Sequence, residues 1–180
     1  MTTQKSDPLL AILRLIVMFM MGVLAFVAVT LVICSPFLII FQADILAELA
    51  AEGKGEFGWP MIAMLFGLLL SIAVLLGMAI YFFHLLLKIT DSVRQGDPFI
   101  PENAVRLTRM GWTAVAGHLW AIIVAIPAGW LAKIAADAGE DVWADIDFGG
   151  GGLILILVLF ILARVFRKGT EMREELEGTV

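Results

Sequence analysis

The stretch KITDSVRQGDPFIPENAVRLTRMGW, residues 88–112, is the one long, mixed-charge segment rich in basic residues that lies between apolar runs. The whole chain is 61% apolar and 16% charged, whereas a soluble globular protein is about 45–50% apolar and about 25% charged. A single core formed by 180 residues cannot bury that excess. We therefore expect most apolar side chains to face lipid and residues 88–112 to lie at one face of the membrane.

Four apolar runs predict an all-α integral membrane protein with transmembrane helices at about residues 9–41, 59–87, 111–131 and 148–165. The first run is about 50 Å long as a helix, against about 30 Å of hydrocarbon, so it must tilt, project or bend. Pro36 is the expected kink because it removes one backbone donor. A short amphipathic helix with an acidic face is expected just after this run. We predict one four-helix transmembrane domain over residues 1–180.

The basic residues predict the orientation of these helices. Of the twelve Lys and Arg residues, all except Lys54 and Lys133 belong to the N-terminus, the segment between spans two and three, or the C-terminal tail. Positively charged residues concentrate on the cytoplasmic side of membrane proteins. We therefore predict that both termini are cytoplasmic, with a cytoplasmic helical hairpin at residues 88–110 and a cytoplasmic helix in the tail, residues 166–180.

Ionisable side chains inside a membrane are costly and are therefore functional candidates. The predicted spans offer three: Arg14, His84 and His118. We expect Arg14 to extend toward the interface, with an intramembrane ion pair as the alternative. His118 is expected to be a neutral histidine bonded to a neighbouring helix. The alternatives are a pH switch or a metal or haem ligand, for which His84 is the only possible histidine partner.

Motifs for soluble-enzyme chemistry are absent from the sequence. It contains no GxxxxGK[ST], GxSxG, HExxH or CxxC motif, and Cys34 is its only cysteine. The formal net charge of −5 is not the signature of a nucleic-acid-binding surface. We therefore predict a protein without catalytic activity, cofactor, metal site or direct contact with nucleic acid.

The hairpin and the tail remain as candidate binding surfaces. Gly96 and Pro98 should break the helix, Phe99 should bury against a neighbour, and Asn103 can cap or cross-link the loop. The tail helix is expected to lie on the basic face formed by Arg106 and Arg109, or to receive a basic partner. The alternative is a simple folded hairpin with interfacial basic residues. The predicted partner-binding residues are Arg94, Asp97, Pro98, Phe99, Asn103, Arg106, Arg109, Phe166, Arg167 and Arg173.

The segments GDPFIPENAVRLTRMGW, residues 96–112, and ARVFRKGTEMREELEGTV, residues 163–180, resemble a bacterial four-span membrane family known as domain of unknown function 2975. Members of that family are commonly encoded beside a small helix-turn-helix regulator. The resemblance thus implies a protein of the bacterial plasma membrane that restrains, or signals through, a small DNA-binding regulator. The alternatives are a small oligomeric permease or channel subunit and a membrane scaffold, and a homo-oligomer is compatible with each.

Overall fold

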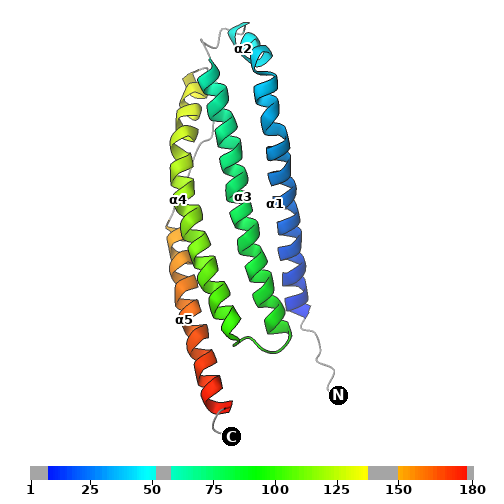
Figure 1. The fold of residues 1–180 in the computed structure, drawn as a ribbon, viewed down its shortest axis with the longest axis vertical. Coiled ribbons are helices and arrows are strands. Elements are labelled where there is room, and N and C mark those ends of the chain that lie inside the picture. The colour runs from blue at the N-terminus through cyan, green and yellow to red at the C-terminus, as the bar shows by residue number, and fades with distance from the viewer. Residues whose placement is uncertain (1–7, 52–57, 138–149, 178–180) are drawn as a thin grey trace. The chain divides into compact units, whose positions relative to one another are not determined.

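The computed structural model describes residues 8–51, 58–137 and 150–177, which form five α-helices and no strand (Figure 1). The predicted all-α class is confirmed. The domain boundaries predicted at residues 1 and 180, and the start of the fourth predicted span, lie outside the described residues. The helices are α1 (Pro8–Ile40), α2 (Gln42–Ala51), α3 (Trp59–Arg94), α4 (Pro101–Asp137) and α5 (Gly151–Glu177).

Three of the described helices, α1, α3 and α4, are long and apolar enough to cross a membrane. In α5 the charges begin at Arg164, so its uncharged part, residues 151–163, is about 20 Å long, against about 30 Å of hydrocarbon. The described residues therefore show a membrane protein with three helices of spanning length. A fourth crossing and the orientation of the chain stay predictions.

The helix ends follow local sequence signals. Helix α1 continues through Pro36, and α2 forms where an acidic amphipathic helix is expected. Helix α3 continues from its apolar run through Lys88 to Arg94, and α4 begins at Pro101, where a missing backbone donor leaves no helical hydrogen bond unmade. The polar segment of the sequence is thus two helix ends joined by a short turn at residues 95–100.

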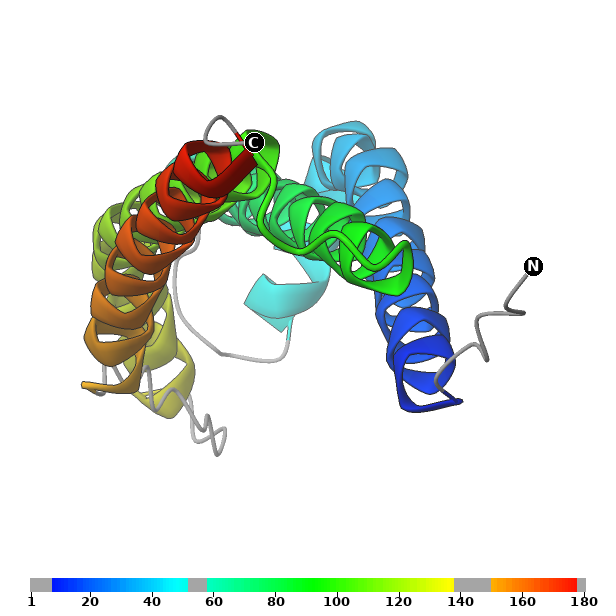
Figure 2. The same cartoon turned by 90° about the horizontal axis from the view of Figure 1, so that it is seen from below.

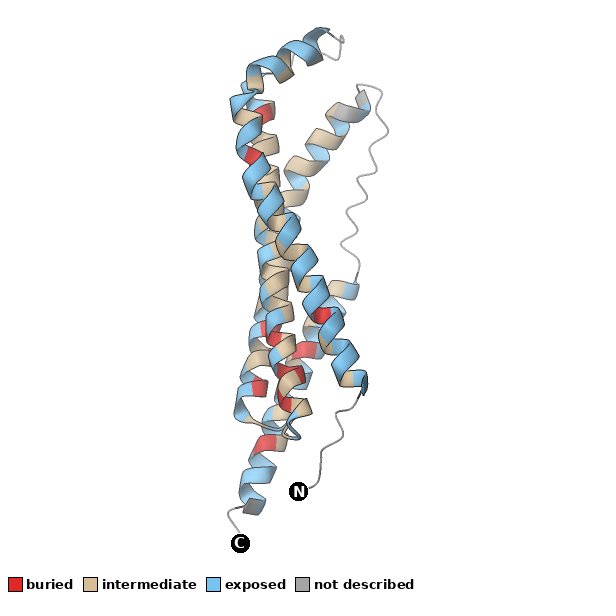
Figure 3. Cartoon of the chain, turned by 90° about the vertical axis from the view of Figure 1, so that its right-hand side faces the viewer, coloured by how far each residue is buried: buried red, intermediate tan, exposed pale blue. Residues whose placement is uncertain are grey.

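The described residues divide into two compact units. The first contains residues 8–24, 78–118 and 150–177, and the second contains residues 25–51, 58–77 and 119–137. The hydrophobic core belongs to the first unit and joins α3, α4 and α5. Its buried residues are Leu85, Ile89, Leu107, Met110, Leu159 and Ala163. Most of α1 is exposed, as Figure 3 shows in pale blue, which is expected where lipid is the solvent.

Helix α5 lies antiparallel beside the N-terminal part of α4 in the first unit (Figures 1 and 2). The Phe160 ring covers Gly111, where an added Cβ would come within 3.0 Å of its Cζ atom. Trp112 packs edge-on against the same ring, with the centroids 5.7 Å apart. Further along the pair, Gly152 lies beside the His118 ring. Small residues at these positions let the two helices approach closely, which is the main way in which helices associate in lipid.

We predict that Gly111→Leu destabilises the protein by about 1–3 kcal/mol because the added side chain must displace the Phe160 ring. Gly77→Leu is the matched control, since a Cβ at Gly77 meets nothing within 4 Å. Thermal unfolding in detergent, followed by circular dichroism, measures the difference. Equal melting temperatures for the two variants would contradict this packing.

Candidate functional site

The turn between α3 and α4 begins with a glycine that ends α3. Gly96 adopts a positive φ of 84°, which favours glycine. Its amide donates to the Val93 carbonyl at 3.0 Å, and the Asp97 amide donates to the Ser92 carbonyl at 3.2 Å. This pair of bonds is a Schellman motif, which satisfies the last carbonyls of a helix. Pro98 then prevents the helix from continuing, so Asp97 and the residues after it project from the helix end.

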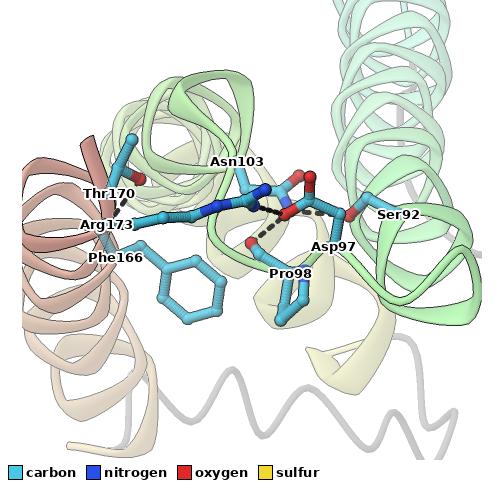
Figure 4. A network of polar contacts seen from close by, with 7 residues as sticks. All are labelled: Ser92, Asp97, Pro98, Asn103, Phe166, Thr170 and Arg173. Carbon is cyan, nitrogen blue, oxygen red and sulfur yellow. Dashed lines mark hydrogen bonds and ion pairs between the residues drawn. The ribbon is translucent and has the colours of Figure 1, made fainter. Parts of the chain in front are cut away.

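Asn103 cross-links this turn from the first turn of α4 (Figure 4). Its side chain is fully buried. The amide nitrogen donates to Ser92 Oγ at 2.6 Å and to the Pro98 carbonyl at 2.8 Å. The Ser92 hydroxyl in turn donates to the Ile89 carbonyl at 2.7 Å. Both amide protons of Asn103 are therefore used, and the turn is tied to α3 and α4 together.

Arg106 completes this network on the α4 side. Its guanidinium donates to Asn103 Oδ1 at 2.7 Å and to the Lys88 carbonyl of α3 at 3.3 Å. Sequence reasoning placed Arg106 with Arg109 on a basic face of the hairpin. The structure directs its guanidinium inward, where it orients Asn103 and holds α3 to α4.

The tail is held against the turn by five residues, Asp97, Phe99, Phe166, Gly169 and Arg173, which we call the clasp. The Arg173 guanidinium pairs with the Asp97 carboxylate (Figure 4). The rings of Phe99 and Phe166 pack at a centroid distance of 5.3 Å. An added Cβ on Gly169 would come within 2.6 Å of Phe99 Cδ1, so the Phe99 ring occupies the space that any larger residue at position 169 would need.

The clasp combines an aromatic pair with an ion pair, and aromatic pairs typically contribute about 0.5–1.5 kcal/mol beyond the area that they bury. The Asp97 and Arg173 side chains are 40% and 45% exposed, and exposed ion pairs typically contribute about 0–1 kcal/mol. The tail therefore does contact the hairpin, but not through the expected basic face. The hairpin supplies the carboxylate of Asp97, and the tail supplies the guanidinium of Arg173. Phe99 keeps 41% of its surface exposed.

A second set of charges links α1 to α3. Asp91 pairs with Arg14 of α1 at 3.4 Å and with Arg94 at 3.7 Å. Arg14 therefore has an ion partner, Asp91, which belongs to the polar segment after the second apolar run. An ion pair inside the membrane stays a prediction. Because the three side chains are 30–42% exposed, the pairs position α1 more than they stabilise it.

The other predicted site residues lie apart from these networks. Arg109 and Arg167 are exposed on α4 and α5, and His84 is exposed on α3. His118 faces the first turn of α5, where a Cβ on Gly152 would lie 3.3 Å from its Nδ1 atom. Within residues 8–51, 58–137 and 150–177, no group of three or more His, Cys, Asp or Glu side chains is placed to hold a metal ion.

Sequence reasoning missed Ser92 and Asp91, and it expected Met172 and Leu176 on the tail helix without counting them among the site residues. Met172 and Leu176 form an exposed apolar face of the tail, where they are 50% and 72% exposed and lie one helical turn apart. A four-residue spacing of apolar side chains in a charged helix was the available signal for this face. No local signal marks Ser92, because its partner Asn103 lies eleven residues away.

Comparison with known families identifies the chain. Residues 41–180 match the family described as Protein of unknown function (DUF2975). The chain belongs to this family. The match confirms the resemblance that the hairpin and tail segments carry. The matched residues contain helices α2 to α5. No curated protein and no solved structure matches the chain.

We predict that Asn103→Ala lowers the free energy of unfolding by at least about 1–3 kcal/mol, because Arg106 and the Pro98 carbonyl lose a buried partner. Thr108→Val is the matched control on the same helix. The Thr108 hydroxyl donates only to the Ala104 carbonyl of its own helix, so its loss leaves no other residue unpaired. Unfolding of the two variants in detergent tests the difference. An Asn103→Ala variant as stable as Thr108→Val would show that the network does not hold the turn.

Proposed function

We propose that the chain is a non-enzymatic, four-span protein of the bacterial plasma membrane whose cytoplasmic hairpin and tail bind a small helix-turn-helix regulator. The clasp is the observation that carries this proposal. It joins the turn and the tail into one surface. The paired residues Asp97 and Arg173 are 76 residues apart in the sequence. The choice of a regulator as the partner rests on the family resemblance. We propose that the membrane protein restrains this regulator at the membrane or signals through it.

The clasp also supports the four-span topology. Helix α4 starts beside the turn at residues 95–100 and, as a spanning helix, carries the chain to the opposite face of the membrane. The Asp97–Arg173 and Phe99–Phe166 contacts require the tail to lie on the same face as the turn. We therefore propose that the chain crosses back between α4 and Phe166. The excess of Lys and Arg on these segments favours the cytoplasm for that face.

The tail offers an apolar contact surface in a segment too charged for lipid. The charged residues that follow the apolar run are Arg164, Arg167, Lys168, Glu171, Arg173, Glu174 and Glu175, so we place the part of α5 after Arg167 in water. Met172 and Leu176 nevertheless expose their side chains on it. An apolar pair at this spacing is the pattern by which a helix enters a groove on a partner protein. The half-exposed Phe99 ring adds a further apolar contact on the hairpin.

The buried network makes this surface rigid. Asn103, Arg106 and Ser92 fix the turn, and Asp97 and Arg173 fix the tail to it. A preordered surface loses less conformational entropy on binding, which favours affinity for a partner. We therefore assign four predicted site residues to holding this surface together: Asp97, Asn103, Arg106 and Arg173. The residues that we assign to contact with the regulator are Phe99, Met172 and Leu176.

The proposal is tested by copurification from native membranes. Full-length tagged protein is purified as wild type, as Met172→Asp/Leu176→Asp, and as the matched control Glu174→Gln, which alters an exposed residue on another face of the same helix. Mass spectrometry identifies the recovered proteins. We expect a small helix-turn-helix protein with the wild type and the control, and at least tenfold less with the double variant, because a charge in an apolar contact is costly. Equal recovery by all three, or no such protein with the wild type, would contradict the proposal.

A further inference from the structure

Two arginines on α5 follow its apolar run without an acidic partner. Arg164 and Arg167 are exposed, and within the described part of the chain no carboxylate forms an ion pair with either one. Lys168, the next basic residue, differs because its ammonium binds the Glu171 carboxylate at 3.2 Å. The two arginines therefore carry positive charge that no carboxylate of the described residues neutralises.

Arg164 and Arg167 lie on one face of the helix. Residues three apart on a helix are neighbours, with Cβ atoms about 5–6 Å apart, and like charges at this spacing repel. An anion that accepts hydrogen bonds from both guanidinium groups would remove that repulsion. Each guanidinium offers a planar fork of donors that matches the oxygen atoms of a phosphate group.

An aromatic pair lies beside the two arginines, toward the apolar part of α5. Phe160 lies one turn before Arg164 on α5 and packs edge-on with Trp112 of α4. The Trp112 side chain is 63% exposed. A tryptophan with its indole partly packed and partly exposed is typical of the headgroup level of a membrane.

The apolar residues of α5 set the depth of this site. Leu157 and Ile161 are exposed within the uncharged part of the helix, as expected for side chains that face lipid tails. The first charge after them is Arg164. Its guanidinium and that of Arg167 are therefore at the boundary between hydrocarbon and headgroups, where phospholipid phosphates lie.

We propose that Arg164 and Arg167, flanked by Trp112 and Phe160, form a binding site for the phosphate of an anionic phospholipid. The guanidinium groups bind the phosphate, and the aromatic pair contacts the glycerol and the first part of the acyl chains. The site is separate from the proposed docking of a regulator. It assigns Arg167 to the membrane rather than to the protein partner.

Native mass spectrometry of the full-length protein tests the site. The protein in detergent is titrated with phosphatidylglycerol, with phosphatidylcholine, and with phosphatidylglycerol in the presence of excess inorganic phosphate. The variants are Arg164→Gln/Arg167→Gln and the matched control Lys168→Gln. Unchanged helix content and a single elution peak confirm that each variant is folded.

We expect the wild type and Lys168→Gln to bind phosphatidylglycerol equally, more tightly than phosphatidylcholine and without displacement by inorganic phosphate. The double variant should bind about 30-fold more weakly, since each basic residue near an anionic headgroup contributes about 1 kcal/mol. Equal affinity of the double variant, or an equal loss with Lys168→Gln, would overturn the site. Equal binding of phosphatidylcholine would exclude recognition of an anionic lipid, and displacement by inorganic phosphate would show a soluble anion as the ligand.

Discussion

The packing of the Phe99 ring onto Gly169 is the contact on which the proposed surface depends. It brings the tail to the turn between α3 and α4, and the Phe166 ring and the Asp97–Arg173 pair reinforce it. Because we place the turn and the tail outside the bilayer, burying the Phe99 and Phe166 rings also removes apolar surface from water, which favours the contact. The core around Leu85, Leu107 and Leu159 lies in the same compact unit as the clasp. The hydrophobic core found among the described residues thus lies in the unit that supports the hairpin and the tail.

Much of the helical fold was predictable because its signals are local. Long apolar runs indicated α1, α3 and α4, while Gly96, Pro98 and Pro101 marked the turn between α3 and α4. The fourth span was harder to predict. The run LILILVLFILA indicates a spanning helix, yet the uncharged part of α5 is shorter than the hydrocarbon is thick. The contacts of α5 with α4 lie between residues far apart in the sequence, and a single apolar run does not predict them.

The site was predicted as a set of residues but not as an arrangement. Asn103 and Arg106 were expected from their positions in the hairpin, but the inward direction of Arg106 depends on the Lys88 carbonyl, which lies eighteen residues away. The tail was expected against the hairpin's arginines, whereas Arg173 pairs with Asp97 instead. The charges of the tail and the hairpin predict that the two segments meet, but they do not predict which side chains pair. Burial of Asn103 and the glycine under Phe99 determine which side chains face each other.

Cross-linking in native membranes tests the clasp most directly. Cys34→Ser removes the only cysteine, after which Asp97→Cys/Arg173→Cys is compared with Asp97→Cys/Glu175→Cys, whose second position lies on another face of α5. A short bifunctional maleimide should join positions 97 and 173 within one chain, and should join 97 to 175 much less. Labelling of positions 97 and 173 by an impermeant maleimide from opposite sides of the membrane, with no cross-link between them, would contradict the account.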